Sequence, residues 1–256
     1  MSSTEINVIE EIELDNPILI EALPGIGHVG KLAVDSMIDE LEATKFAEIY
    51  SPYFPPQIFI GEEGMIENMI NELYYLKDFG ENKQDFIFLV GNTQGVSSEG
   101  QYEICMDILN YLEKFNINTM YTLGGIATGQ PVENPKILGA ATDVEMVEFL
   151  KESDIEIRYN DGGIIGASGL FLGLGKRKGI VGACLMGETP GYFIDAEAAE
   201  AILIKLSDLL SIEVNTEKLD ERAEETRKML EKAQQMEQEM MNKSSNQDVD
   251  DLRYIG

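Results

Sequence analysis

Apolar residues in this chain gather in short continuous runs that alternate with stretches of helical spacing. The runs predict strands, because a strand covered on both faces of a sheet needs apolar side chains on both. They are residues 17–23, 85–91, 119–125, 137–141 and 179–185. Stretches with apolar residues at every third or fourth position predict amphipathic helices. They are residues 31–41, 102–115, 144–151 and 196–210, the last with Asp195 as its N-cap.

This alternation of strands and helices predicts an α/β fold, with a mostly parallel sheet flanked by helices on both faces. Residues 6–14 alternate loosely between apolar and polar and predict an edge strand. A chain of 256 residues with 44% hydrophobic content is long enough to bury one large core. We therefore expect residues 1–213 to form a single α/β core domain.

Beyond residue 213 the composition changes to Glu, Lys, Arg, Gln and Met. Residues 214–243 predict a charged amphipathic helix that packs through one narrow apolar stripe. The stripe consists of Leu219, Ala223, Thr226, Leu230, Ala233 and Met240. Residues 244–256 begin with a polar stretch that has nothing to bury, and we expect a flexible tail there.

The charge balance narrows the partners, since 47 acidic residues against 19 basic ones give a formal net charge of −28. Nucleic acids and anionic membranes are disfavoured, because binding them requires clustered Lys and Arg. Basic protein surfaces or cations are the partners that such a field attracts. Solubility in a hot or salty cytosol explains the same charge equally well.

The sequence contains no strong indication of a metal site, a bound cofactor or a signal peptide. Cys105, Cys184 and the single histidine, His28, do not supply the ligand spacing of a structural zinc site. The N-terminus has neither a basic region nor an apolar region, so we expect a cytoplasmic protein with no signal peptide. We expect no resident cofactor or metal.

The stretch Gly25-Ile26-Gly27-His28-Val29-Gly30 matches the GxGxxG dinucleotide fingerprint and lies between a predicted strand and a predicted helix. One interpretation is a nucleotide- or nucleoside-binding enzyme that uses this loop. The other is structural, because glycines permit tight turns and close helix–strand packing without any ligand. Leu32 rules out a P-loop, since that motif needs a Ser or Thr hydroxyl for magnesium.

Two further loops follow predicted strands. Residues 124–131 carry Gly124, Gly125 and Gly129, and residues 92–95 form a polar loop after the preceding strand. Both are expected at the same edge of the sheet, where α/β folds place ligands, and together they could form a pocket. No paired acid and base emerges from them. Ser168 stands in a sequence that resembles a nucleophile elbow but lacks its closing glycine.

The chain ends in Leu252-Arg253-Tyr254-Ile255-Gly256, beyond the polar stretch. An aromatic and apolar terminus on a solvated tether lowers solubility, so its presence suggests a pocket on a partner that receives it. A tether of this kind is effective when several tails of a homo-oligomer dock together. The alternative is a terminus without any role.

Three segments together resemble the archaeal proteasome assembly chaperone family, homologous to the eukaryotic proteasome assembly chaperones. They are Leu23-Pro24-Gly25-Ile26-Gly27-His28-Val29-Gly30-Lys31-Leu32-Ala33, the loop Gly124-Gly125-Ile126-Ala127-Thr128-Gly129, and residues 162–175. The resemblance covers roughly residues 15–210. Each glycine loop alone is a weak signal, whereas their order and spacing are specific.

The resemblance implies a nucleoside phosphorylase-like α/β fold without known catalytic residues, and an activity in assembling the 20S proteasome by binding its α subunits. It also implies a structural role for Pro24 and the glycines of the two loops. Related proteasome partners end in a hydrophobic–Tyr–any-residue motif, whose terminal carboxylate meets a lysine between α subunits. In this chain Tyr254 is third from the end instead of second, so the carboxylate of Gly256 would lie farther out. A rival without this resemblance is an acidic scaffold with an unrelated partner.

Overall fold

The computed structural model describes residues 3–159, 162–221 and 223–224. Its strands are β1 (Glu5–Val8), β2 (Ile18–Glu21), β3 (Thr44–Tyr50), β4 (Ile58–Ile60), β5 (Ile66–Asn68), β6 (Asn71–Phe79), β7 (Gln84–Gly91), β8 (Thr119–Ala127), β9 (Ile137–Ala141), β10 (Glu156–Ile157) and β11 (Val181–Thr189). Its α-helices are α1 (Val29–Glu40), α2 (Ser98–Leu112), α3 (Val144–Glu152), α4 (Ala167–Arg177) and α5 (Ala196–Leu210). Short 3₁₀ turns are η1 (Ile26–His28), η2 (Glu62–Gly64) and η3 (Glu113–Phe115).

Within the described residues, the strands form a nine-stranded sheet and a separate two-stranded hairpin, β4–β5. The sheet order is β1-β3-β6-β7-β2-β8-β11-β9-β10. The central strands β7, β2, β8 and β11 are parallel to one another. The pairs β1–β3, β3–β6, β6–β7 and β11–β9 are antiparallel.

The expectation of a mostly parallel sheet therefore holds for its centre and is wrong for its flanks, so the whole sheet is mixed. The parallel strands are buried on both faces, and this is why their sequences are continuous apolar runs. The antiparallel strands β3 and β6 are only half buried and carry polar residues between apolar ones. The predicted edge strand is present as β1, but it ends at Val8, short of the expected residue 14.

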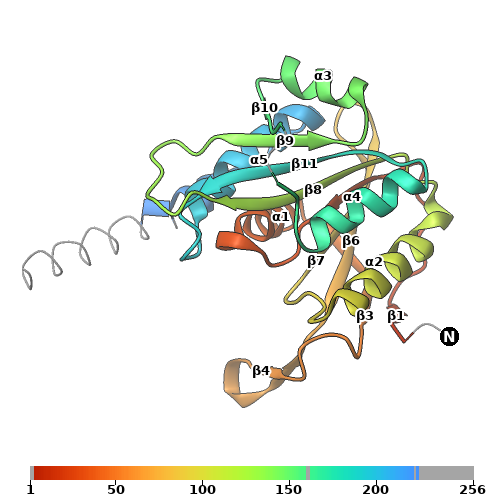
Figure 1. Ribbon diagram of the computed structural model, residues 1–256. Coiled ribbons are helices and arrows are strands. Elements are labelled where there is room, and N and C mark those ends of the chain that lie inside the picture. The colour runs from red at the N-terminus through yellow and green to blue at the C-terminus, as the bar shows by residue number, and fades with distance from the viewer. Residues whose placement is uncertain (1–2, 160–161, 222, 225–256) are drawn as a thin grey trace, which may run out of the picture.

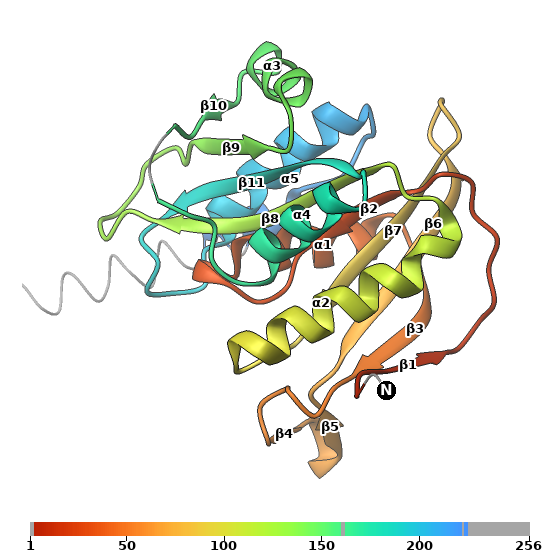
Figure 2. The same cartoon turned by 45° about the vertical axis from the view of Figure 1, so that its right-hand side comes forward.

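Helices cover both faces of the sheet, as expected (Figure 1). On one face α2 and α4 pack over a core that includes Phe46, Leu89 and Phe171, while α1 and α5 cover the other over Phe88, Leu123 and Ile202. Figure 2 shows α2 and α4 together in front of the sheet, with α1 and α5 behind it. The result is a three-layer α/β/α sandwich.

The predicted helices 31–41, 102–115, 144–151 and 196–210 correspond to α1, α2 with η3, α3 and α5. The Asp195 carboxylate accepts a hydrogen bond from the Ala198 amide at 3.0 Å, so the predicted cap of α5 is confirmed. Helix α4 was not predicted, because its sequence is rich in glycine. No helix in the described part of the chain is both long enough and apolar enough to span a membrane.

The start of the C-terminal segment packs on the core. Residues 217–221 are helical, Leu219 and Ala223 are buried, and Lys218 pairs with Glu40 at 2.6 Å. These two apolar residues belong to the predicted stripe. The rest of the predicted charged helix 214–243, the predicted tail 244–256 and the docking residues Leu252 to Gly256 lie outside the described residues.

Candidate functional site

The loops that follow β2, β8 and β11 meet at the carboxyl-terminal edge of the central strands. Gly27 accepts a hydrogen bond at its carbonyl oxygen from the Asp195 amide at 2.9 Å. The Thr128 amide donates to the Thr189 carbonyl oxygen at 2.8 Å. The two glycine loops predicted from the sequence, residues 24–30 and 124–129, are thus brought together with the loop after β11.

Several glycines of these loops are required by packing. A Cβ atom at Gly30 would overlap the carbonyl oxygen of Leu123, and a Cβ atom at Gly125 would overlap that of Ile26. Gly27 has a φ of +61°, in the left-handed region that glycine tolerates best. The geometry supports the structural interpretation for these three glycines, since each permits a close approach or a tight turn.

The polar loop 92–95 joins the same site through Gln94. The side-chain nitrogen of Gln94 donates to the Pro24 carbonyl oxygen at 2.7 Å, and its side-chain oxygen accepts from the backbone amide of Ala167 at 3.0 Å. Gln94 therefore links the loop after β2 to the start of α4. The expected convergence of the two polar loops on a pocket is confirmed.

These loops enclose a cavity of about 450 Å³. Its wall is mostly backbone and apolar side chains, with Arg158 as the charged lining residue. The lining residues are Leu23, Gly25, Ile26, Gly30, Gln94, Leu123, Gly124, Gly125, Ile126, Ala127, Arg158, Gly163, Ile164, Ile165, Ser168, Cys184 and Met186. We call this the glycine-loop pocket. Its volume is in the range of sites for small ligands.

A buried acid that was not predicted from the sequence, Glu21, lies behind the wall of this pocket, next to Ser168 and Cys184. Glu21, Thr122 and Cys184 stand in register on the neighbouring strands β2, β8 and β11. Glu21 is fully buried, and this burial raises the pKa of its carboxyl group to about 8. A single carboxylate within a predicted buried strand was the signal that could have identified it.

The groups that line the pocket do not form a nucleophile–base pair. Burial raises the pKa of the Cys184 thiol to about 12, so the thiol is protonated at neutral pH. The Ser168 hydroxyl donates to the Leu123 carbonyl oxygen at 3.3 Å. His28, the single imidazole of the sequence, occupies the N-cap position of α1 without a capping hydrogen bond from its side chain. That side chain is exposed and is not part of the pocket wall. Among the described residues there is also no group of three potential metal ligands.

A second feature at this edge of the molecule is the β4–β5 hairpin, which projects away from the sheet (Figures 1 and 2). Ile60 and Ile66 stand opposite each other and are 79% and 68% exposed. Ile58, Phe59 and Met65 are also exposed. We call these five residues the hairpin cluster. Exposed apolar groups of this kind mark surfaces that bind other proteins.

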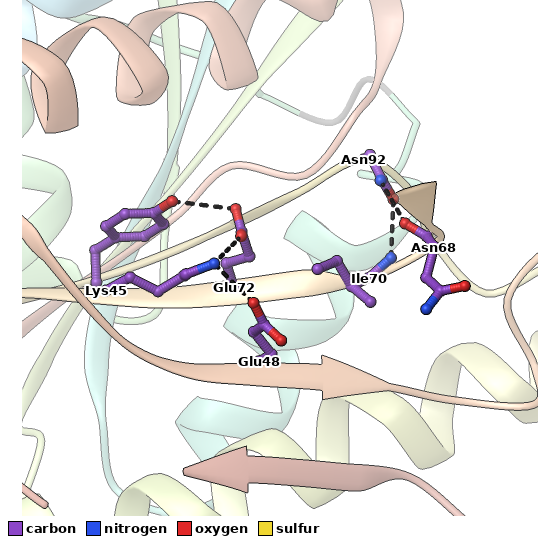
Figure 3. A network of polar contacts seen from close by, with 7 residues as sticks. Lys45, Glu48, Asn68, Ile70, Glu72 and Asn92 are labelled. Carbon is purple, nitrogen blue, oxygen red and sulfur yellow. Dashed lines mark hydrogen bonds and ion pairs between the residues drawn. The ribbon is translucent and has the colours of Figure 1, made fainter. Parts of the chain in front are cut away.

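Polar contacts hold the base of the hairpin (Figure 3). The Asn92 side chain accepts from the Ile70 amide and donates to the Asn68 carbonyl oxygen, both at 3.0 Å. The strands on either side of the hairpin are joined by Lys45 on β3, which contacts Glu48 at 2.7 Å and Glu72 on β6 at 3.0 Å. The hairpin is therefore anchored to the ends of β6 and β7.

Comparison with known proteins places these features in a family. The protein is 42% identical over 251 residues to the uncharacterized protein MJ1210 of Methanocaldococcus jannaschii, which covers 97% of this chain and 96% of the relative. The crystal structure of Pyrococcus furiosus PbaB, described as an archaeal proteasome activator, has a TM-score of 0.86 and 39% identity, covering 91% of this chain and 100% of PbaB.

P. furiosus PbaA, described as an archaeal homolog of proteasome-assembly chaperone, has a TM-score of 0.72 and 28% identity, covering 92% of this chain and 100% of PbaA. These similarities confirm the resemblance that the glycine loops indicated. The sequence model of the PAC2 family matches residues 19–234, which is most of the chain. This protein belongs to the PAC2 family.

Proposed function

We propose that this protein binds the 20S proteasome and assists its assembly or activation, without catalysis of its own. The observation that carries the proposal is its similarity, over nine tenths of the chain, to both PbaB and PbaA. One of these is described as a proteasome activator and the other as a homolog of an assembly chaperone. The apolar hairpin cluster supports a protein-binding role, and the pocket without a nucleophile–base pair is consistent with it.

We further propose that the C-terminal residues Leu252, Arg253, Tyr254, Ile255 and Gly256 dock between α subunits of the proteasome. The support is their sequence, which ends a polar stretch with an aromatic and an aliphatic residue. In a homo-oligomer several such tails would bind one α ring, and the linkage would raise the effective concentration of each tail. The acidic surface, with a net charge of −28, would favour a basic partner surface.

Deletion of residues 252–256 tests the docking. We expect the truncated protein to unfold at the same temperature as the full chain and to lose capture of the 20S proteasome in a pull-down. The control is Tyr102→Ala, which removes an exposed tyrosine of α2 and should leave capture unchanged. Unchanged capture by the truncated protein would refute docking by the tail.

Two assays on the same proteins separate the two roles. An assembly chaperone accelerates formation of 20S particles from separate α and β subunits, whereas an activator raises peptide hydrolysis by particles already formed.

The rival function is an enzyme that acts on nucleosides or nucleotides at the glycine-loop pocket. Turnover of such a substrate by the purified protein, combined with no capture of proteasome subunits, would favour that rival.

A further inference from the structure

Three glycines of the glycine-loop pocket are not explained by packing. A Cβ atom at Gly124 or Gly163 would meet no atom within 4 Å, and one at Gly25 would meet only the Leu23 carbonyl oxygen at 3.9 Å. None of the three has a positive φ. A larger residue would fit each backbone, but its side chain would enter the cavity. Glycine at these positions keeps the pocket open and lets a ligand approach backbone amides.

The two helices that start at the pocket differ from the other three. Gly30 in the first turn of α1 and Ser168 in the first turn of α4 both line the cavity. Neither helix has a capping side chain at its own N-cap residue or an acidic residue in its first turn, although the neutral Gln94 side chain accepts from the Ala167 amide of α4. Each of the others has both: Ser97 and Glu99 for α2, Asp143 and Glu145 for α3, Asp195 and Glu197 for α5. The positive ends of α1 and α4 are therefore not neutralised by their own side chains, which favours an anion between them.

The buried Glu21 is a second and independent indication of a missing ligand. One of its carboxyl oxygens accepts from the Leu23 amide at 3.2 Å, and the other is buried without a hydrogen-bond partner among the described residues. Glu21 itself does not line the cavity, but its neighbours Ser168 and Cys184 do, so its carboxyl group lies just behind the cavity wall. A neutral carboxylic acid can donate a hydrogen bond to a bound oxyanion.

Among the described residues, the groups that face Glu21 include no second acid. They are Ser168 from α4, Cys105 from α2, Thr122 from β8 and Cys184 from β11, and burial raises the pKa of both thiols. Arg158, which lines the cavity, contributes positive charge close to Cys184. Burial therefore keeps Glu21 neutral, and Arg158 favours a negative group in the cavity.

We propose that the glycine-loop pocket binds a small organic anion. Its phosphate or carboxylate group lies between the N-termini of α1 and α4, above Glu21, and its apolar body packs on Ile26, Ile126 and Ile165. These three side chains belong to the cavity wall, and Ile165 is 96% exposed at the cavity mouth. The site requires no docking to the proteasome, so failure of either proposal leaves the other standing.

Three probes with one apolar ring and different heads test the proposal: phenyl phosphate, benzoate and benzyl alcohol. Each is titrated against the full-length protein at pH 7 by ligand-observed NMR. We expect at least one anion to bind about tenfold to one hundredfold more tightly than the alcohol, as a charge-assisted hydrogen bond implies. Preference for phenyl phosphate identifies a phosphate ligand, and preference for benzoate a carboxylate ligand. Equal binding of all three probes, or binding of none, overturns the proposal.

Substitution of an open glycine locates the site. Gly124→Val places a side chain in the cavity and should weaken binding of the preferred anion at least about tenfold, with an unchanged melting temperature. The matched control is Gly173→Val, because Gly173 is exposed on α4 and its Cβ atom would also meet nothing within 4 Å. If Gly124→Val does not fold, Gly163→Val replaces it as the blocking variant. Binding that survives a folded blocking variant overturns the assignment to this pocket.

Discussion

The glycine-loop pocket and the β4–β5 hairpin lie at the same edge of the sheet but are built in opposite ways. Since β6 is antiparallel to both β3 and β7, the chain leaves β3 at the edge where β7 and β2 end. The pocket is sunk into the core and stands over one buried, uncharged acid. The hairpin projects from the core and exposes its apolar residues. The first suits a small ligand, and the second suits the surface of another protein.

This contrast predicts that the two regions respond differently to charge. A charge below the pocket is shielded from solvent, since Glu21 is fully buried, whereas a charge on the exposed hairpin stays hydrated. A charge below the pocket should therefore cost several kcal/mol, and a charge on the hairpin should cost almost nothing.

The largest effect is expected from Glu21. Its pKa is about 8 in the folded protein against an ordinary value of 4.5, so the folded state keeps a proton that the unfolded state loses. The retained proton contributes to the free energy of unfolding. This contribution is fully present below about pH 4.5 and is lost as the pH rises to about 8. At 1.36 kcal/mol per pKa unit the loss is at most about 5 kcal/mol. Glu21→Gln cannot ionise and should lack this loss.

Denaturant unfolding of both proteins at pH 5 and pH 8.5 measures the difference. The free energy of unfolding should fall more steeply for the natural chain than for Glu21→Gln. Glu133→Gln, which changes an exposed carboxylate, should follow the natural chain at both pH values. Parallel profiles for all three proteins would show that Glu21 is already charged in the folded state.

A smaller effect is expected from Gly30→Val. The new Cβ atom overlaps the carbonyl oxygen of Leu123, which is backbone of the central strand β8 and cannot move aside easily. Overpacking of this kind costs about 3 kcal/mol. Gly173→Val should change the free energy of unfolding by less than about 0.5 kcal/mol, because its site is open. Equal stability of the two variants would mean that α1 does not pack against β8 as described.

These residues also show how far sequence patterns reach. Strands β2, β7, β8 and β11 were predicted because burial on both faces requires continuous apolar runs, and the loops after them were expected at one edge. Strands β3 and β6 were not predicted, because half-buried strands such as Asn71–Phe79 mix polar and apolar residues. Without them, the position of the hairpin could not be inferred.

The details of the pocket depend on contacts between residues far apart in the chain. Gln94 contacts Pro24 and Ala167 across gaps of 70 and 73 residues, which no local pattern specifies. From the sequence, Gly30 and Gly124 were expected to have the same structural role. The structure separates them, because the neighbour of the first is the backbone of Leu123 and the neighbour of the second is open space.

The smallest effect on stability is expected from charging the hairpin cluster. The double variant Ile60→Asp/Ile66→Asp places two carboxylates opposite each other at the end of β4–β5. Both isoleucines are mostly exposed, so each substitution should change the free energy of unfolding by no more than about 0.5 kcal/mol. Any assembly that buries the hairpin should nevertheless dissociate, because two carboxylates would then be buried without partners.

Denaturant unfolding and sedimentation velocity on the same samples separate these two consequences. The matched control is Ile204→Asp, which places one charge on an exposed isoleucine of α5, on a different surface. A hairpin used for docking gives a variant with natural stability and a weaker association than the control. A loss of more than about 2 kcal/mol in the double variant would instead mean that the hairpin packs against its own core. In that case its apolar residues would contribute to folding, and the contrast with the pocket would disappear.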